Sequence, residues 1–311
     1  MKNRTRRGEP VERPRAEISI GGVRITHPDK LWWPGDGITK GDVAAFYDRI
    51  SPAILPWLKD RPLTAERCPG GMAGPCFFQK NFPDAAAAGI PTVPIRAEST
   101  GKIVNYVVGG TKKALLTLVN FGCIAIHVMN CRKDSLDQPD WLAFDLDPSS
   151  GGFAAAARAG LLLRDILEEE KIRSFPKTSG SRGLHVFVPL ARGATQDGTR
   201  AFAAEIGRRL AERAPKLVTV EMSKARRGSR VFADALRNAF GQTIVPPYSV
   251  RRRPKAPVST PLDWSEVDPK LDPARFNLGN FEKRLASADP WKGFWKSRQT
   301  VAGAGSGDGS A

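Results

Sequence analysis

The sequence predicts a mixed α/β (α+β) fold, because short apolar segments alternate with longer segments of helical periodicity. The apolar segments end at turns rich in Pro, Ser and Gly and are expected to be strands: 103–108, 116–128, 141–147, 184–190 and 217–222. Two segments, 153–172 and 195–214, repeat apolar residues at helical spacing and should each pack one face on a sheet. A chain of 311 residues can bury an ample core.

The N-terminal part begins with a charged segment, residues 1–17, that is expected to be a disordered arm or linker. A strand is predicted over 16–25 and a helix over 43–50, with Thr39 and Asp42 forming a capping box before the helix. Lys30 and Lys40 flank the intervening turn. They could both face one anion, or they could be two solvated surface lysines.

A Pro-rich region, 56–94, is expected to be irregular and contains the adjacent aromatics Phe77 and Phe78. An exposed ring beside Lys80 would suit stacking on a nucleic-acid base. The commoner alternative is that such a pair is buried in the core.

The C-terminal part ends with a predicted helix, 281–288, and an aromatic segment. Residues 18–297 are therefore expected to form one domain, and the Gly-rich residues 298–311 a flexible tail or linker.

The charge balance is strongly basic: 48 Lys and Arg against 32 Asp and Glu give a net charge of +16. That excess favours a polyanionic partner, nucleic acid before an acidic membrane. No apolar run of about 18 residues and no signal peptide occur, so a cytoplasmic protein without a membrane span is expected. The spacing of the cysteines is unusual for zinc, and free thiols are predicted for all four: Cys68, Cys76, Cys123 and Cys131.

The segment Trp141 to Pro148, WLAFDLDP, carries the main chemical signal. Asp145 and Asp147 are two residues apart, so on a strand both carboxylates point to the same face. Neighbouring carboxylates repel unless a cation lies between them, and oxygen ligands favour Mg²⁺ or Mn²⁺. A pair of exposed turn aspartates is the alternative. The short predicted strand VFAD adds a third strand-end carboxylate, Asp234.

The segment KTSGSRGLHVFVPL offers groups that bind phosphate: Ser179, backbone N–H groups of the turn, Arg182 and, on the following strand, His185. It lacks the Gly-Lys-Ser/Thr element of a Walker loop. Carboxylate-bound metals beside such a turn suit nucleotidyl transfer from a triphosphate, and a nuclease is the related alternative.

Three motifs, DWLAFDLDP, TSGSRGLHVFVPL and RVFADALRN…PPYSVRRRPKAPVSTPL, resemble the polymerase domain of bacterial DNA ligase D. This is the non-homologous end-joining polymerase of the archaeo-eukaryotic primase superfamily. The resemblance runs from about Ile20 to Trp295 and implies a compact primase-polymerase fold. In that fold a central, mainly antiparallel catalytic sheet is flanked by helices.

The resemblance also implies roles for individual residues. Two Mn²⁺ or Mg²⁺ ions would be held by the catalytic residues Asp145, Asp147 and Asp234. The nucleotide would be bound by Ser179, Arg182, His185, His127, Arg227 and Arg251, with His127 near its sugar. DNA would be bound by Lys30 and Lys40 at the 5′-phosphate of a downstream strand, and by Phe77, Phe78 and Lys80.

The implied activity is template-dependent addition of nucleotides, with ribonucleotides preferred, to DNA ends and 5′-phosphorylated gaps during double-strand break repair. Nucleoside triphosphates, Ku and an ATP-dependent DNA ligase are the implied partners, and a nucleoid-associated location follows. The chain departs from the family pattern at Glu66, in HVMNCR and at Ala235. A non-catalytic end-bridging module and a primase remain alternatives.

Overall fold

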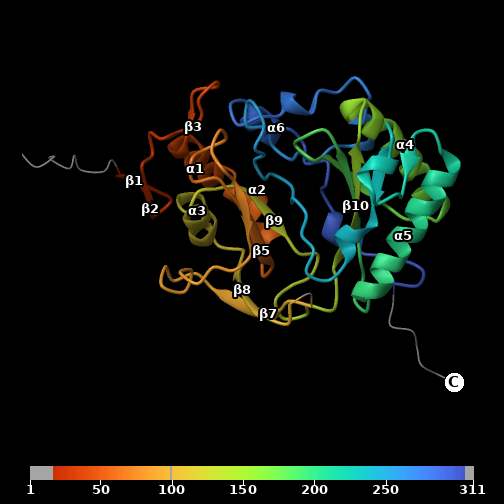
Figure 1. The fold of residues 1–311 in the computed structure, drawn as a ribbon, viewed down its shortest axis with the longest axis horizontal. Coiled ribbons are helices and arrows are strands. Elements are labelled where there is room, and N and C mark those ends of the chain that lie inside the picture. The colour runs from red at the N-terminus through yellow and green to blue at the C-terminus, as the bar shows by residue number, and fades with distance from the viewer. Residues whose placement is uncertain (1–16, 99, 305–311) are drawn as a thin grey trace, which may run out of the picture.

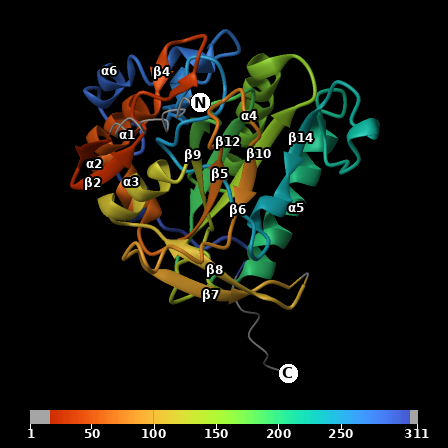
Figure 2. The same cartoon turned by 60° about the vertical axis from the view of Figure 1, so that its left-hand side comes forward.

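A computed structural model describes residues 17–98 and 100–304 and shows two five-stranded β-sheets with helices at both ends of the molecule (Figures 1 and 2). Helices α4 (Gly152–Glu169) and α5 (Gln196–Arg213) lie together at one end. Helices α1 (Lys40–Arg49), α2 (Ser51–Leu58) and α3 (Lys112–Asn120) lie toward the other. Within the described residues, no helix is long and apolar enough to cross a membrane.

The first sheet carries the Asp-x-Asp segment on its central strand. Its strands, in spatial order, are β11 (Phe175–Thr178), β12 (Leu184–Pro189), β10 (Trp141–Pro148), β14 (Val231–Asp234) and β13 (Val218–Thr219). All neighbours are antiparallel except β13 and β14, which are parallel. The apolar faces of α4 and α5 pack on this sheet, so the predicted, mainly antiparallel sheet flanked by helices is confirmed.

The second sheet is built on β5. It contains β6 (Phe77–Gln79), β5 (Pro62–Arg67), β8 (Ile103–Val108) and β7 (Thr92–Arg96), with β9 (Cys123–Val128) also paired with β5. A backbone bridge between Val128 and Ile244 connects β9 to the segment that follows the first sheet. One hydrophobic core runs through both sheets, so the two halves form a single packed unit.

Small hairpins and short helices complete the fold. The hairpins pair β1 (Glu17–Ile20) with β2 (Val23–Thr26) and β3 (Leu31–Trp33) with β4 (Ile38–Thr39). The short helices are α6 (Phe281–Leu285), η1 (Lys224–Arg226), η2 (Ala235–Asn238), η3 (Trp264–Glu266), η4 (Pro273–Arg275) and η5 (Phe294–Lys296).

The N-terminal predictions are confirmed in one part and wrong in another. Thr39 and Asp42 form the predicted capping box, although α1 begins at Lys40. The single strand expected over 16–25 is instead the β1–β2 hairpin, because Gly21 and Gly22 both have positive φ and turn the chain back. Residues 1–16, most of the predicted arm, lie outside the described residues.

The prediction of one strand over 116–128 is wrong for its first half. Residues 112–120 form α3, because the Thr111 hydroxyl accepts from the Ala114 N–H and caps a run of good helix formers. The strand β9 begins only at Cys123. A continuous apolar run does not by itself separate a strand from a buried helix.

Two regions expected to lack structure are ordered. The Pro-rich segment 56–94 contains β5, β6 and the start of β7, and Pro62 begins β5, where a strand tolerates proline. The expected flexible tail packs on the domain over 298–304, since Gln299 bridges to Leu190 and Val301 is buried. Residues 305–311 lie outside the described part.

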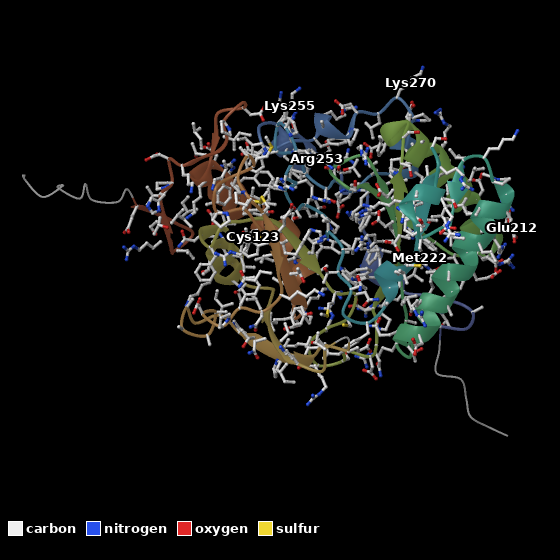
Figure 3. All side chains as sticks on the ribbon, in the orientation of Figure 1. Cys123, Glu212, Met222, Arg253, Lys255 and Lys270 are labelled. Carbon is white, nitrogen blue, oxygen red and sulfur yellow. A yellow bond between two sulfur atoms is a disulfide. The ribbon has the colours of Figure 1, made fainter. Side chains whose placement is uncertain are left out.

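The prediction of four free thiols is wrong for one pair. Cys68 and Cys76 form a disulfide with a Cα–Cα distance of 4.4 Å. They directly follow and precede the paired ends of β5 and β6, so the hairpin sets them opposite one another. Cys123 and Cys131 are free and buried, and Cys123 lies in the interior (Figure 3).

Candidate active site

A cavity of about 470 Å³ lies between the two sheets. The first sheet and its turn contribute Asp145, Asp147, Ser179, Ser181, Arg182, Gly183 and His185 to the lining. The second sheet contributes Thr64, Phe78, Lys80 and His127. The loops after the first sheet contribute Arg237, Gln242, Thr243, Ile244, Val245, Arg251 and Arg253. The cavity therefore has carboxylates and phosphate-binding groups on one wall and an aromatic, polar wall opposite.

Strand register brings the three predicted carboxylates to neighbouring positions. Asp145 and Asp147 alternate with buried Leu146 on β10 and so share a face. Asp234, the last residue of β14, lies directly opposite Asp145. The first and third carboxylates therefore meet across two antiparallel strands.

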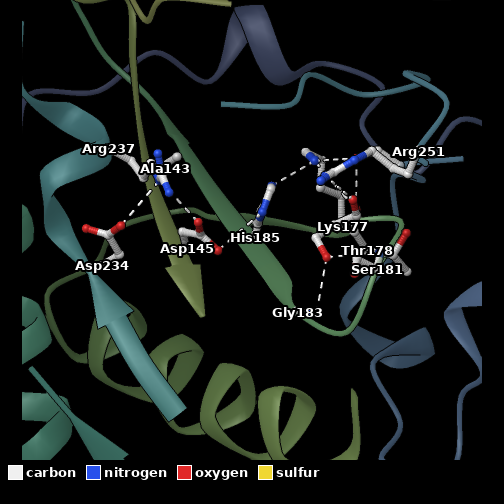
Figure 4. Close-up of polar contacts among 12 residues, drawn as sticks. Ala143, Asp145, Lys177, Thr178, Ser181, Gly183, His185, Asp234, Arg237 and Arg251 are labelled. Atoms are coloured by element: carbon white, nitrogen blue, oxygen red, sulfur yellow. Dashed lines mark hydrogen bonds and ion pairs between the residues drawn. The ribbon is translucent and has the colours of Figure 1, made fainter. Parts of the chain in front are cut away.

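Arg237, which sequence reasoning missed, lies between two of these carboxylates (Figure 4). Its Nε is 3.3 Å from an oxygen of Asp145 and 3.3 Å from an oxygen of Asp234. The 3₁₀ turn η2 positions it, because the Asp234 carboxylate accepts from the Leu236 N–H at 2.9 Å. The Asn238 side chain bonds both the N–H and the C=O of Ala143, which fastens the turn to β10.

The surroundings shift the pKa values of the three carboxyl groups. Burial, and secondly the charge of Asp145, raise the pKa of Asp147. Burial also raises the pKa of Asp234, and Arg237 opposes that rise. Burial alone would raise the pKa of Asp145, but His185 and Arg237 beside it outweigh burial and lower its pKa. Asp145 is therefore ionised at neutral pH.

The three carboxylates are suitable ligands for a hard divalent cation, but in this structure they are not close enough to one another to coordinate one. Three carboxylates at adjoining strand positions supply the oxygen ligands that Mg²⁺ and Mn²⁺ prefer. Yet in residues 17–98 and 100–304, no group of three or more His, Cys, Asp or Glu side chains is close enough to hold a metal. The Arg237 guanidinium supplies the positive charge between Asp145 and Asp234 that a metal would supply.

The predicted phosphate turn is organised by Ser179. Its hydroxyl accepts from the N–H groups of Ser181 and Gly183 at 3.2 and 3.1 Å, so these N–H groups face Ser179 and not the cavity. Gly180 has a φ of 68°, and a Cβ there would lie 2.5 Å from the Arg251 side chain, so only glycine fits. The cation Arg182 is exposed at the cavity and remains available to an anion.

His185 links the carboxylates to a buried lysine. Its Nε2 lies 3.4 Å from Asp145 and its Nδ1 2.9 Å from Lys177 Nζ. Burial and the Lys177 charge lower the pKa of His185 to about 4, so the ring is neutral at neutral pH. The ionised Asp145 can only accept, so the proton is on Nε2 and Nδ1 accepts from Lys177. Lys177 also donates to the Ser259 hydroxyl, and burial lowers its pKa.

The remaining predicted nucleotide-binding arginines occupy different places. Arg251 is half-buried in the lining, and its Nη1 donates to the Ser179 carbonyl at 2.8 Å. Arg227 is buried outside the lining, where its guanidinium stacks 3.6 Å from the Phe232 ring centre and donates to the Glu221 and Met222 carbonyls. Arg227 affects the site by its charge, which lowers the pKa of Asp234 in opposition to burial.

The wall contributed by the second sheet holds three predicted residues. The His127 ring packs edge-on against Phe78 with centroids 5.2 Å apart. Burial, followed by Arg251 and Arg237, lowers the pKa of His127 well below its ordinary value, so this ring is neutral too. Lys80 lines the same cavity and donates to the Gly241 carbonyl at 3.2 Å. The structure thus places Phe78 and Lys80 beside the predicted nucleotide residues.

The other predicted DNA-binding residues, Phe77, Lys30 and Lys40, lie outside the lining of this cavity. Phe77 and Phe78 have exposed fractions of 49% and 61%, so the burial alternative does not hold for either ring. Lys30 is exposed and donates to the Pro69 carbonyl at 2.6 Å. Lys40 is buried and donates to Thr26 and Asn120.

Glu66, where the chain departs from the family pattern, is buried and ion-paired. Its Oε1 accepts from Arg252 Nε at 2.9 Å. The three arginines of the basic cluster, 251–253, therefore differ in role. Glu66 neutralises the charge of Arg252, whereas Arg251 and Arg253 line the cavity.

Sequence reasoning missed Arg237 and Lys177. Arg237 follows Asp234 by three residues, a spacing that returns a side chain to the same side in one helical turn. Lys177 is the register partner of His185 across β11 and β12. Either could be found only once the pairing of the strands and the turn after Asp234 were known.

Comparison with known proteins agrees with this geometry. The family model described as "LigD, primase-polymerase domain" matches residues 39–291. The chain belongs to the LigD primase-polymerase family. The resemblance noted from the three motifs is thereby confirmed.

Relatives with curated descriptions and a solved structure support the same assignment. The chain is 32% identical over 259 residues to "Multifunctional non-homologous end joining protein LigD" of Mycolicibacterium smegmatis, covering 82% of this chain and 34% of that protein. It is 32% identical over 293 residues to the Pseudomonas aeruginosa protein of the same description, covering 93% and 35%. The chain therefore spans about a third of the length of these relatives.

The structural match covers nearly the whole fold. The "Polymerase Domain from Mycobacterium tuberculosis Ligase D in complex with DNA" has a TM-score of 0.81 and 28% sequence identity, and the match covers 89% of this chain and 99% of that one. The predicted primase-polymerase fold is confirmed.

Proposed function

We propose that this domain is a template-dependent, metal-requiring nucleotidyltransferase that extends DNA 3′ ends across short gaps in non-homologous end joining. The proposal takes its biological setting from the family, whose curated members are described as end-joining proteins. The proposed chemistry rests on the residues that line the cavity between the two sheets.

The observation that carries the proposal is the composition of this cavity. Two of the strand-end carboxylates, Asp145 and Asp147, share one lining with four arginines, Arg182, Arg237, Arg251 and Arg253. Phosphate oxygens are bound by arginine, and a reacting phosphoryl centre needs carboxylate-held cations beside it. One cavity therefore offers places for both the triphosphate and the reacting centre.

Asp145, Asp147 and Asp234 would hold divalent metal ions, Mn²⁺ or Mg²⁺. Such ions would lower the pKa of a primer 3′-hydroxyl and neutralise charge on the phosphates during an in-line displacement. The chain's own residues supply the remaining functions. Arg237 holds Asp145 and Asp234 at a fixed separation before a metal arrives, since its Nε contacts both.

His185 and Lys177 fix the orientation of Asp145. The neutral His185 ring donates from Nε2 to Asp145, and Lys177 donates to its Nδ1 and to the Ser259 hydroxyl. Asp145 on β10 is the register partner of His185 on β12 and of Asp234 on β14. A substitution at His185 would therefore change the orientation of the Asp145 carboxylate.

The triphosphate is proposed to lie against the turn after β11. Arg182 is exposed there, and Arg253 donates to the Ser181 hydroxyl at 3.0 Å, so both cations face this part of the lining. Arg251 supports the turn through the Ser179 carbonyl. The base is proposed to lie on the opposite wall at Phe78, whose exposed ring can stack on any base.

Downstream DNA is proposed to approach along the surface that carries Lys30 and Phe77. Lys30 uses one N–H on the Pro69 carbonyl, so two N–H groups remain for a 5′-phosphate. Lys40 has all three N–H groups occupied, so it would have to exchange one acceptor to reach a phosphate directly. Ku and an ATP-dependent ligase are the proposed partners at a break.

The test is extension of a primer across a one- to three-nucleotide gap with a 5′-phosphorylated downstream strand, in the presence of Mn²⁺. Template-matched extension would support the proposal. Tight binding to the end without extension would favour an end-bridging module, shortening of the primer would favour a nuclease, and synthesis without a primer would favour a primase.

A further inference from the structure

A second cavity, of about 310 Å³, lies at the end of β10 that is opposite to the carboxylates. Its polar lining residues are Arg132, Ser135, Gln138, Asp140, Arg192 and Arg298. Within the described chain, it shares no lining residue with the cavity that holds Asp145. Asp140 directly precedes β10 and comes five residues before Asp145, which is about 17 Å along a strand. The two cavities are therefore separate places on the molecule.

Backbone pairing brings the segments that line this cavity together. The Ala191 N–H donates to the Gln299 carbonyl at 2.9 Å, just beyond the end of β12. Arg192 follows the first of these residues and Arg298 precedes the second. Two arginines that are about a hundred residues apart in the sequence are thus fixed around one cavity by the fold.

Two arginines of the cavity lie beside the same indole ring. The guanidinium carbons of Arg132 and Arg298 are 5.6 and 5.5 Å from the centre of the Trp295 ring. A cation–π contact orients a flexible arginine without neutralising its charge, because the ring has no net charge. These two positive charges are therefore held near one another before any ligand binds.

The carboxylate in the lining does not neutralise these charges. Among the described residues, Asp140 is the single acidic residue of the lining, and it is already paired with Arg61 Nη2 at 2.5 Å and Arg132 Nε at 2.9 Å. Arg192 and Arg298 are exposed and have no ion pair in the described part of the chain. Positive charges gathered in this way repel one another unless an anion lies between them.

A phosphate group is the anion that suits this lining. Guanidinium groups bind phosphate oxygens through paired N–H···O bonds, and a serine hydroxyl or a glutamine amide can donate to a further oxygen. Ser135 and Gln138 lie in the lining beside the arginines. We propose that Arg192 and Arg298, together with Arg132, form a second phosphate-binding site on this chain. The site does not depend on the nucleotidyltransferase activity proposed above.

Two kinds of molecule could supply the phosphate: a nucleic-acid strand and a free polyphosphate such as pyrophosphate. Successive nucleotides of a strand in a duplex advance by about 3.4 Å along the helix axis. A duplex held at the carboxylates can therefore present a phosphate about five nucleotides away at the second cavity. A nucleic-acid strand is the source that we expect.

The experiment compares binding by the full chain and by the double variant Arg192→Gln and Arg298→Gln. Fluorescence anisotropy measures binding of a gapped duplex at several salt concentrations, and calorimetry measures binding of pyrophosphate. EDTA is present throughout, so no metal-dependent reaction contributes. The matched control is the double variant Arg158→Gln and Lys270→Gln, which removes two exposed positive charges outside this cavity.

We expect the arginine double variant to bind the duplex about tenfold more weakly and to reduce the slope of log K against log salt by about 0.9 to 1.8. The control should change the affinity by less than about twofold. The double variant Arg192→Lys and Arg298→Lys keeps both charges, so it should recover the salt slope. It should recover only part of the affinity, because lysine cannot form the paired bonds of a guanidinium.

The two ligands distinguish the sources of the phosphate. Weaker binding of the duplex supports the site with a nucleic-acid strand as its ligand. Weaker binding of pyrophosphate, with duplex binding unchanged, supports the site with a free polyphosphate as its ligand.

Three results would overturn the inference. Unchanged binding of both ligands would show that the arginines contact no phosphate. An equal loss of duplex affinity in the control variant would show only a general attraction to positive charge. Binding of polyglutamate that falls as much as binding of the duplex would assign the cavity to an acidic peptide.

Discussion

Arg237 Nε lies 3.3 Å from Asp145 and 3.3 Å from Asp234, on two neighbouring antiparallel strands. A guanidinium thereby neutralises a carboxylate pair that would otherwise repel. The same two residues are among the three that are proposed to hold divalent cations. Arg237 and the metal therefore compete for Asp145 and Asp234, and this competition makes Arg237 testable.

Replacing Arg237 by Met should lower the Mn²⁺ concentration needed for half-maximal extension, because the competing cation is gone. The maximal rate should fall about 10- to 100-fold, since a charge-assisted contact contributes about 1.5–3 kcal/mol. Arg237→Lys, which keeps the charge, should retain a metal requirement closer to that of the unaltered chain. A Mn²⁺ titration of gap filling measures both quantities, and an unchanged or higher Mn²⁺ requirement in Arg237→Met contradicts the competition.

Lys30→Ala should weaken the preference for a 5′-phosphorylated over a 5′-hydroxyl gap. Loss of one phosphate contact should reduce the dependence of log K on log salt by about 0.9. Binding of the two gapped duplexes by fluorescence anisotropy at several salt concentrations provides the measurement. Lys216→Ala, an exposed lysine just beyond α5 at the other end of the molecule, is the matched control. Equal effects of the two substitutions would mean that Lys30 contributes only general charge.

The preference for a 5′-phosphate should also fall as pH rises from 7 to 9. Burial, and secondly Lys30, lower the pKa of Lys40 to about 8, so its positive charge is lost through that range. Lys40→Arg keeps its charge and should show a flatter pH profile. A profile in Lys40→Arg that matches the unaltered chain would remove Lys40 from the explanation.

The same lowered pKa has a consequence for stability. Between about pH 8 and the ordinary value of 10.5, the unfolded chain holds a proton on Lys40 that the folded chain has released. The contribution of this group to the free energy of unfolding therefore rises with pH across that window and is smallest below pH 8. Urea unfolding at several pH values, with Lys40→Met as the reference, measures this slope.

The fold could be predicted wherever the sequence pattern is compatible with only one type of secondary structure. The helices over 152–169 and 196–213 repeat apolar residues at helical spacing, and the Asp-x-Asp strand is a short apolar run that ends at a turn. These elements are confirmed. Helix α3 was missed because its apolar positions run almost continuously. Strands β5 to β7 were missed because prolines and glycines conceal short strands whose pairing comes from distant segments.

The sequence predicted which types of residue form the candidate site, but for most of them it did not predict their arrangement in space. Asp145 and Asp147 share a face by local geometry alone, so that part of the prediction needed only the strand. The position of Asp234 opposite Asp145 depends on strand order, which no local pattern gives. Lys177 carries no motif, and its contact with His185 appears only when β11 and β12 pair.

The Cys68–Cys76 disulfide should contribute about 2.5 kcal/mol to the free energy of unfolding, from closing a loop of about nine residues. In urea unfolding, the double variant Cys68→Ala and Cys76→Ala should have a free energy of unfolding lower by about that amount. A reducing agent should not change the stability of this variant. The unaltered chain should lose a similar amount on reduction. A stability that does not respond to reductant would mean that these thiols are free in solution.

The most direct test of the central claim is gap filling by Asp145→Asn. The substitution keeps the size of the side chain and removes the charge that contacts Arg237 and a metal. We expect extension with Mn²⁺ to fall by at least about 100-fold while binding to the gapped duplex changes less than about threefold. Asp165→Asn, on α4 and paired with Arg164, should behave as the unaltered chain does. Extension by Asp145→Asn at a rate close to that of Asp165→Asn would contradict metal-dependent transfer at this site.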